Sequence, residues 1–337
     1  MLPAQSHTAA GLECQNGTTA ERLPRTKMEP FSDRLVESIR KAGNPCVVGL
    51  DPRVDLMPAF IKSGRSPTRD AIRSVIRDFH ELVLDGVAGL VPAVKLQSAF
   101  FEQYGSPGIQ AFEDTIDAAR QRGMLVIADA KRNDISSTAE AYAAAFLGET
   151  DVLGQKQSAF DADSMTVTPY LGQDSLLPFV EACQRHGKGL FVVLKTSNQG
   201  STNYQDQRLQ DTGRPLYETI AGTINELGQH LIGESCYSSI GAVVGATFPR
   251  DARRLRRLMP QAFFLVTGYG KQGASGRDAA VCFNADGMGA IVSSSRAITY
   301  AFPDGNATRQ SFACCVRENT LRMISDITTE LKAHING

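Results

Sequence analysis

The chain has 337 residues, 42% of them hydrophobic and 21% charged, which is enough to bury a large core in one or two α/β domains. Its 35 basic and 36 acidic residues leave a formal net charge of -1, so no global field recruits nucleic acid or an anionic membrane. The seven cysteines contain no C-x-x-C pair, which argues against a zinc site or a disulfide framework. No window reaches the ~20 apolar residues that span a bilayer. We therefore expect a cytoplasmic protein without nucleic-acid or membrane partners.

Residues 1–27 are rich in Thr, Ala, Gln and Glu, and they lack both hydrophobic periodicity and the apolar segment of a secretory signal. After Met28, an amphipathic helical pattern begins with apolar residues at Phe31, Leu35, Val36 and Ile39. We expect residues 1–27 to be a disordered extension, or to precede a true start at Met28. Residues 28–337 would then form the folded domain, and secretion is not expected.

Beyond Met28, short apolar runs alternate with longer helical patterns, which is typical of βα units around a parallel sheet. Strands are predicted at residues 46–50, 92–96, 125–129, 164–168, 189–194, 240–244, 263–267 and 290–293. Helices are predicted between them, among others at 68–84, 109–122, 135–147, 175–186, 215–231 and 311–334. Eight such units in one chain favour an α/β fold of the (β/α)8 TIM barrel type over a doubly wound sheet.

Polar residues follow several of the predicted strands, at the end where a barrel of this type carries its active site. They are Asp51, Lys95, Asp129 with Lys131, the segment 195–198, and Ser295 with Arg296. Each has an ordinary alternative, because Asp51 before Pro52 can cap a turn, Lys95 can extend its amine to solvent, and Arg296 can pair with a helix carboxylate. Their common position at strand ends nevertheless favours a single pocket.

The segment 129–135 reads Asp-Ala-Lys-Arg-Asn-Asp-Ile and directly follows an apolar strand. Positions two apart on a strand face the same way, so Asp129 and Lys131 project together and Asp134 follows shortly after. A lysine between carboxylates stays protonated, because opposite charges nearby favour the ammonium form. The ordinary alternative is a solvated salt-bridge cluster at a strand-to-helix corner.

Residues 268–276 match the dinucleotide pattern G-x-G-x-x-G, with Asp286 downstream. The pattern is weak, and it occurs in the seventh unit instead of opening a nucleotide-binding domain. Barrels commonly bind phosphate with the loops after strands seven and eight, so we interpret this segment as a mobile phosphate lid. Arg296 and backbone N–H groups near Ala297 would hold the phosphate.

Together these residues resemble a known family, since Asp-x-Lys-Arg-x-Asp-Ile at 129–135, followed by Thr138, is similar to the signature of orotidine 5'-phosphate decarboxylases. Further matching segments are Gly-Leu-Asp-Pro at 49–52, Val-Lys-Leu-Gln at 94–97, Thr-Val-Thr-Pro-Tyr-Leu-Gly at 166–172, Lys-Thr-Ser-Asn at 195–198, Gly-Lys-Gln-Gly at 270–273 and Ser-Arg at 295–296. Their order is that of the longer bacterial branch, over about residues 30 to 335. One departure is Gln199, where the family pattern has Pro, and it puts the rigidity of this loop in doubt.

The resemblance implies site residues by position. Lys131 would donate a proton to C6 of the pyrimidine, with Lys95, Asp129 and Asp134 completing an alternating charge network. Substrate contacts are implied for Asp51 and Lys95 at the ribose, Thr196 and Ser197 at the base, Gln272 between base and phosphate, and Ser295 and Arg296 at the phosphate end. In the family, Asp134 and Thr138 reach the neighbouring subunit's site, which implies a homodimer. No metal or cofactor is implied.

Three other functions fit parts of the pattern. A sugar-phosphate synthase or decarboxylase of the same superfamily has a related Asp-x-Lys-x-x-Asp motif and normally needs Mg2+. A Schiff-base aldolase could use Lys131 or Lys195, although a lysine flanked by carboxylates keeps its proton and is a poor nucleophile. A catalytically silent nucleotide-binding barrel would be expected to lose the costly charge cluster.

Overall fold

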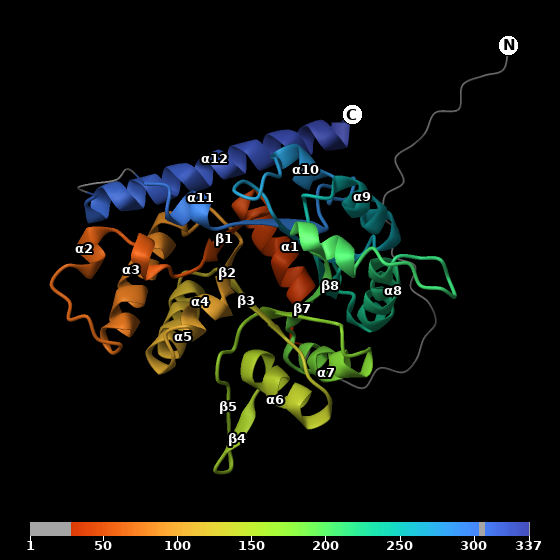
Figure 1. The fold of residues 1–337 in the computed structure, drawn as a ribbon, viewed down its shortest axis with the longest axis horizontal. Coiled ribbons are helices and arrows are strands. Elements are labelled where there is room, and N and C mark those ends of the chain that lie inside the picture. Colours follow the sequence, from red (N-terminus) through yellow and green to blue (C-terminus); the bar gives the residue numbers. More distant parts are fainter. Residues whose placement is uncertain (1–27, 303–306, 337) are drawn as a thin grey trace.

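The computed structural model describes residues 28–302 and 307–336 and has the architecture of a closed barrel surrounded by helices (Figure 1). The barrel strands are all parallel and follow the order β1-β10-β9-β8-β7-β6-β3-β2. This confirms the predicted (β/α)8 TIM barrel. Residues 1–27, for which we expected a disordered extension or a misassigned start, lie outside the described residues.

All eight predicted strands overlap a barrel strand, because strands buried on both faces are nearly continuous apolar runs. The strands are β1 (Cys46–Leu50), β2 (Ala93–Gln97), β3 (Leu125–Arg132), β6 (Ser164–Val167), β7 (Gly189–Lys195), β8 (Ser238–Gly245), β9 (Ala262–Thr267) and β10 (Ala290–Ser294). The third strand extends past the predicted end at Asp129 to Arg132. Its pairing with β6 shifts register between Ala128 and Arg132, and polar residues of this stretch lie at the barrel's open end.

The helices pack outside the strands and bury an apolar layer between the two. They are α1 (Phe31–Ala42), α2 (Ala59–Lys62), α3 (Ala71–Val87), α4 (Ser98–Glu102), α5 (Ser106–Gln121), α6 (Ser136–Leu147), α7 (Leu177–His186), α8 (Leu216–Gly228), α9 (Pro249–Leu258), α10 (Gly276–Ala280), α11 (Arg296–Thr299) and α12 (Arg309–Asn336). Two predicted helices include a tighter turn, since Asp174–Leu176 and Gln229–Leu231 are 3-10 segments. Within the described part of the chain, no helix is long and apolar enough to cross a membrane.

Helix α1 closes the N-terminal end of the barrel. Its Phe31 packs edge-on against Phe191 of β7, with ring centroids 6.0 Å apart, and joins an apolar cluster inside the strands. Arg34 forms an ion pair with Asp163, which lies just before β6. The opposite, C-terminal end of the strands is therefore the end that remains open for a site.

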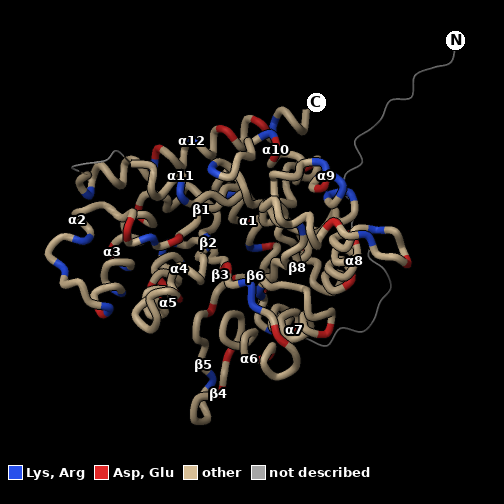
Figure 2. The backbone as a smooth tube through the Cα atoms, in the orientation of Figure 1, with Lys and Arg blue, Asp and Glu red and all other residues tan. Residues whose placement is uncertain are grey.

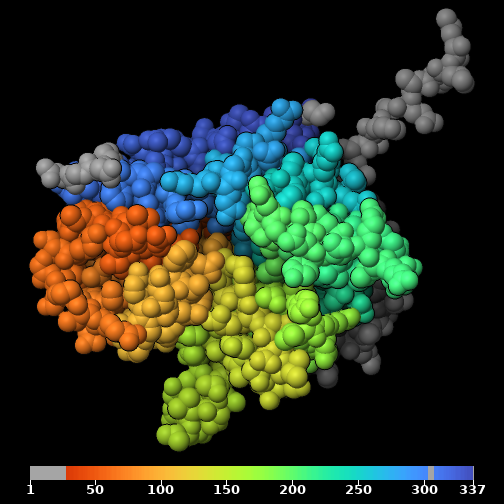
Figure 3. All heavy atoms as spheres, viewed as in Figure 1, coloured from red at the N-terminus to blue at the C-terminus, as the bar shows by residue number. Residues whose placement is uncertain are grey.

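A two-stranded hairpin, β4 (Thr150–Val152) and β5 (Gln155–Gln157), projects from the body after α6 (Figure 3). Leu153 at its turn is 100% exposed. We made no prediction for this hairpin, because its residues are short, polar runs without apolar alternation.

Candidate active site

The predicted site residues of the strand ends meet at the C-terminal end of the barrel. Lys95 lies on β2, Asp129 and Lys131 lie on β3, and Asp51 directly follows β1. Figure 2 shows acidic and basic positions on β2 and β3 near the centre of the molecule. Because neighbouring parallel strands end at the same edge, side chains that are far apart in sequence come together there.

Asp129 is the centre of this cluster. Its Oδ2 accepts hydrogen bonds from Lys95 Nζ at 2.8 Å and Gln97 Nε2 at 3.1 Å. Its Oδ1 accepts from Lys131 Nζ at 2.5 Å and from Thr166 Oγ1 at 2.9 Å. The carboxylate is buried, so the ordinary alternative of a solvated surface cluster does not describe it.

Electrostatics fix the charge states of the buried pair. Burial by itself would raise the pKa of Asp129, but the ammonium groups of Lys95 and Lys131 outweigh it and hold that pKa well below its usual range. Burial likewise opposes the charged form of Lys95, while Asp129 and Asp51 raise the pKa of Lys95 above its ordinary value. The pair of Asp129 and Lys95 is therefore a carboxylate and an ammonium at neutral pH.

The backbone at Lys131 is left-handed, with φ 47°, which is uncommon for a residue other than glycine. Its N–H donates to Thr166 Oγ1 at 3.0 Å, so the neighbouring strand β6 holds this conformation. The turn directs the Lys131 side chain back to Asp129 while 41% of it remains exposed at the open end. Such strain is typical of functional sites, where the surrounding structure over-determines an unfavourable conformation.

Two buried oxygens beside the cluster lack hydrogen-bond partners among the described residues. They are Asp51 Oδ1 and Ser295 Oγ, which follow the adjacent strands β1 and β10. Gly49 allows this close approach, because a Cβ there would lie 2.7 Å from Ser295 Cβ. Buried polar atoms are normally paired, so these two are ready to bind a polar ligand.

The predicted base-reading segment contacts the glycine-rich loop after β9. Ser197 Oγ lies 2.6 Å from Gln272 Oε1 and donates to it, and Thr247 Oγ1 donates to the Ser197 carbonyl at 2.8 Å. Thr196 Oγ1 donates to Asn198 Oδ1 at 2.8 Å. These contacts join the loops that follow β7, β8 and β9 around one opening.

Three predicted residues stand apart from the Asp129 cluster. Arg296 is exposed at the first position of α11 and makes no ion pair within residues 28–302 and 307–336. Asp134 Oδ1 accepts from the Ile135 N–H at 2.7 Å, and in the described chain it does not pair with Lys131. Thr138 is exposed on α6. A single chain therefore does not complete the predicted charge network with Asp134.

Several partners in the site were not predicted. Gln97 and Thr166 bind Asp129, and Gln97 could have been found because it lies two residues after Lys95 on the same strand face. Asp206, which pairs with Lys195, and Tyr300, whose hydroxyl donates to the Asp51 carbonyl at 2.8 Å, come from loops and short helices. Their positions depend on loop paths that carry no sequence period.

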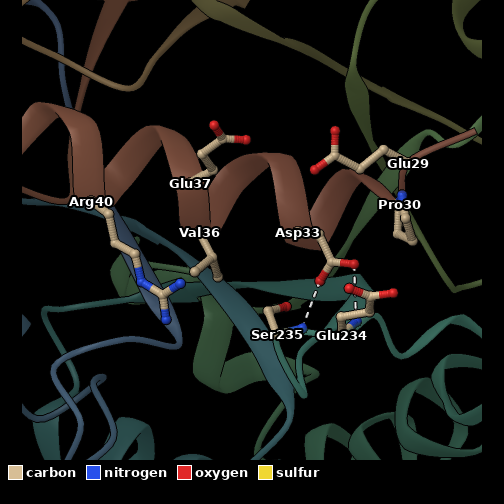
Figure 4. A pocket seen from close by; sticks show the side chains of 8 residues that line it. All are labelled: Glu29, Pro30, Asp33, Val36, Glu37, Arg40, Glu234 and Ser235. Atoms are coloured by element: carbon tan, nitrogen blue, oxygen red, sulfur yellow. Dashed lines mark hydrogen bonds between the residues drawn. The ribbon is translucent and has the colours of Figure 1, made fainter.

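A separate pocket of about 640 Å³ lies at the opposite, N-terminal end of the barrel and contains none of the predicted site residues (Figure 4). In it, Asp33 of α1 accepts hydrogen bonds from the N–H groups of Glu234 at 2.9 Å and Ser235 at 2.8 Å. Its remaining lining comes from Glu29, Pro30, Val36, Glu37 and Arg40. Among the described residues, no group of three or more His, Cys, Asp or Glu is arranged to hold a metal ion.

Comparisons with known proteins identify the family of the chain. The family model "Orotidine 5'-phosphate decarboxylase / HUMPS family" matches residues 48–311. Orotidine 5'-phosphate decarboxylase of Caldicellulosiruptor bescii is 42% identical over 276 residues, which cover 81% of this chain and 90% of that protein. The same enzyme of Rhodopirellula baltica is 43% identical over 275 residues, 81% of this chain and 89% of that protein. The solved structure of Leishmania donovani OMP decarboxylase superposes with a TM-score of 0.67 at 28% identity, covering 90% of this chain and 99% of that chain. The chain therefore belongs to the orotidine 5'-phosphate decarboxylase family.

Proposed function

We propose that this protein decarboxylates orotidine 5'-monophosphate to uridine 5'-monophosphate and CO2, as a step of de novo pyrimidine biosynthesis, with Lys131 protonating C6 and no cofactor. Membership of the family makes it a carboxy-lyase. The observation that carries the proposal is the buried Asp129 carboxylate between the ammonium groups of Lys95 and Lys131 at the open end of the barrel.

The chemistry requires a fixed positive charge at the reacting carbon. Loss of CO2 from C6 leaves a vinyl carbanion with no adjacent carbonyl to delocalise it, so a preorganised ammonium stabilises the charge as it develops. Lys131 would supply this field and then the proton that forms the C6–H bond. Asp129 would lie beside the substrate carboxylate and disfavour the ground state relative to the transition state.

Burial strengthens the electrostatic interactions of the Asp129 cluster. Each tenfold in rate requires ~1.4 kcal/mol, and an exposed ion pair contributes only about 0.2–1 kcal/mol, so a solvated cluster could not provide a large acceleration. Asp129 and Lys95 are both buried, and Thr166 and Gln97 fix the carboxylate further. Charges held by such a scaffold need no reorganisation during the reaction.

The rest of the nucleotide would bind around this centre. We assign Asp51 and Lys95 to the ribose hydroxyls, Thr196 and Ser197 to the pyrimidine, Gln272 to the space between base and phosphate, and Ser295 and Arg296 to the phosphate end. The unpartnered oxygens of Asp51 and Ser295 and the exposed guanidinium of Arg296 support this assignment. Binding energy from the remote phosphate would favour closure of the glycine-rich loop 268–276.

We further propose a cytoplasmic homodimer in which Asp134 and Thr138 enter the neighbouring site. Asp134 lies just before α6 and Thr138 lies in its first turn. Neither residue forms a hydrogen bond or an ion pair with Lys131 within the described residues of its own chain. Cys46, Cys183, Cys282, Cys314 and Cys315 are free thiols, as expected in a reducing compartment.

Substrate choice tests the proposal. Purified protein in EDTA should convert orotidine 5'-monophosphate to uridine 5'-monophosphate. The loss of substrate absorbance and the release of CO2 measure this conversion. Folded protein that is inactive under these conditions but acts on pentulose phosphates with Mg2+ would instead be a sugar-phosphate enzyme. Borohydride trapping with a carbonyl substrate would indicate a Schiff-base aldolase, and nucleotide binding without turnover would indicate a silent barrel.

A further inference from the structure

Lys195 is a buried charge that the proposed reaction does not use. It ends β7 with its side chain 0% exposed, and its ammonium pairs with Asp206 and lies 3.7 Å from Asp251. The same ammonium lies 4.5 Å from the ring centroid of Phe248. An ammonium is costly to bury unless it is paired, and one enclosed in this way cannot touch a substrate. Any effect of Lys195 on the site must therefore be indirect, through the residues that it contacts.

Asp206, which pairs with Lys195, directly follows Gln205 in the chain. The side-chain amide of Gln205 binds Thr196, the residue after Lys195. Gln205 Oε1 accepts from the Thr196 N–H at 2.9 Å, and Gln205 Nε2 donates to Thr196 Oγ1 at 2.9 Å. Two contacts therefore join the ends of the segment 195–206. One is the ion pair of Lys195 with Asp206, and the other is the pair of hydrogen bonds between Thr196 and Gln205, which we call the clamp. We call residues 195–206 the closed loop.

Ser197 follows Thr196 in the closed loop. Two glycines of the neighbouring strands and loops, Gly245 and Gly268, pack closely against it. A Cβ at Gly245 would lie 2.7 Å from the Ser197 backbone, and a Cβ at Gly268 would lie 2.9 Å from Ser197 Cβ. Thr247 binds the Ser197 carbonyl, and the Ser197 hydroxyl reaches Gln272 of the glycine-rich loop. The position of Ser197 is therefore specified on both sides.

We infer that Lys195, Asp206 and Gln205 are positioning residues that preorganise Thr196 and Ser197 to bind the pyrimidine and to meet Gln272. The inference rests on the proposed decarboxylase function, because it assigns a role within that site. The three residues act through the Thr196 backbone and hydroxyl and make no contact with the substrate themselves. Holding binding groups in place avoids their ordering on each binding event, and small displacements reduce rates strongly.

Gln205→Leu tests the clamp, because it removes both hydrogen bonds to Thr196 with little change in volume. Gln207→Leu is a matched control in the following segment, since Gln207 is exposed and its side chain has no hydrogen bond within the described residues. We expect kcat/KM for orotidine 5'-monophosphate to fall about 10- to 100-fold in Gln205→Leu and to stay near wild type in Gln207→Leu. Inhibition by inorganic phosphate should be unchanged in both, because the phosphate end is intact.

A second readout is independent of turnover. Amide hydrogen exchange at residues 196–198, measured without ligand, should be faster in Gln205→Leu than in wild type or Gln207→Leu. Asp206→Asn should also speed exchange at residues 196–198 and lower kcat/KM, and it should destabilise the fold as well, because the buried Lys195 ammonium keeps only Asp251 as a charged partner. A wild type that fails to decarboxylate would sink the proposed function, whereas the exchange result would still report on the clamp. Folded Gln205→Leu with wild-type kcat/KM, or a loss equalled by Gln207→Leu, would overturn the positioning role.

Discussion

Asp129 and Lys131 share one ion pair but differ in burial, with side chains 6% and 41% exposed. Lys95, the other partner of Asp129, is 8% exposed. Removing the carboxylate leaves a buried ammonium without its main partner, whereas removing Lys131 leaves Asp129 bound to Lys95 and Thr166. The two substitutions therefore separate an effect on folding from an effect on chemistry.

For Asp129→Asn, we expect the free energy of unfolding to fall by about 3 kcal/mol, because one charge of a buried pair is left uncompensated. For Lys131→Ala, we expect a loss below about 1 kcal/mol, as for a partly exposed pair. Urea unfolding of both variants at pH 7 measures the difference. Equal losses would contradict the burial argument.

Tyr300 is a second residue that acts through the backbone of the site. Its hydroxyl donates to the Asp51 carbonyl and accepts from the Arg53 N–H, both at 2.8 Å, while its ring stacks on Phe79. Tyr300→Phe keeps the stacking but leaves two backbone groups unpaired, so the Asp51 loop loses its support. We expect kcat/KM to fall roughly tenfold, equivalent to ~1.4 kcal/mol.

The control for Tyr300→Phe is Tyr237→Phe, at the N-terminal end of the barrel. The Tyr237 hydroxyl also has two kinds of partner, Asp286 at 2.9 Å and Asn284 at 2.9 Å, but it supports no site residue. It should lose stability without losing kcat/KM in the folded protein. Equal kinetic losses in the two variants would rule out a specific role for Tyr300.

At the scale of elements, α1 seals the barrel because β7 begins with a residue that has no side chain. A Cβ at Gly189 would lie 2.1 Å from the ring of Phe31, which is buried. Gly189→Ala should therefore destabilise the protein by about 2 kcal/mol through overpacking. Gly222→Ala in α8, where no atom lies within 4 Å, should instead stabilise by about 0.5–1 kcal/mol. Thermal unfolding compares the two, and a stabilising Gly189→Ala would show that α1 does not pack there.

The contact between α3 and α5 contains a buried histidine that makes stability depend on pH. Burial lowers the pKa of His80 to about 3, and its Nδ1 lies 3.1 Å from Thr115 Oγ1. Its pKa in the unfolded chain is near 6.5, so between these values the unfolded state binds the extra proton and stability falls as pH falls. His80 therefore stabilises the fold fully above about pH 6.5 and loses this contribution towards pH 3.

We expect the stability difference between wild type and His80→Gln to change by about 2 kcal/mol from pH 6.5 to pH 5, at ~1.4 kcal/mol per pH unit. Urea unfolding across this range measures it, with the variant showing the shallower slope. Parallel slopes would mean that His80 is not buried as a neutral imidazole.

The sequence predicted the barrel because each strand is an apolar run buried on both faces, and it predicted the Asp129 and Lys131 pair because strand residues two apart share a face. It did not predict the hairpin of β4 and β5, whose strands are three residues each and polar. Nor did it predict the pairing of Lys195 with Asp206, because that contact depends on the path of an irregular loop. The left-handed backbone of Lys131 likewise follows from the fold around it and not from any local glycine or turn signal.

At the scale of the whole molecule, one chain lacks the second carboxylate of the predicted network at Lys131. If Asp134 acts in the neighbouring site, two inactive variants should complement each other. A mixed dimer of Lys131→Ala and Asp134→Ala chains has one site with both changes and one with neither. We expect each variant alone to be nearly inactive and their co-refolded mixture to regain a substantial fraction of wild-type activity.

The controls for the complementation assay are samples of each single variant that are refolded in the same way as the mixture. Refolding each variant with itself gives the background rate, and sedimentation of the wild type gives the oligomeric state. A mixture no more active than its components would mean that Asp134 acts within its own chain, and a monomeric active enzyme would remove the shared site altogether.

The most direct test of the charge mechanism is the rate of orotidine 5'-monophosphate decarboxylation in EDTA by wild type and by Lys131→Ala, with unfolding measured on the same samples. We expect rapid conversion by the wild type and a rate lower by about a thousandfold or more in a variant of nearly unchanged stability, because the ammonium at C6 is lost. A stable Lys131→Ala protein that retains its rate within about tenfold would show that Lys131 does not carry the reaction.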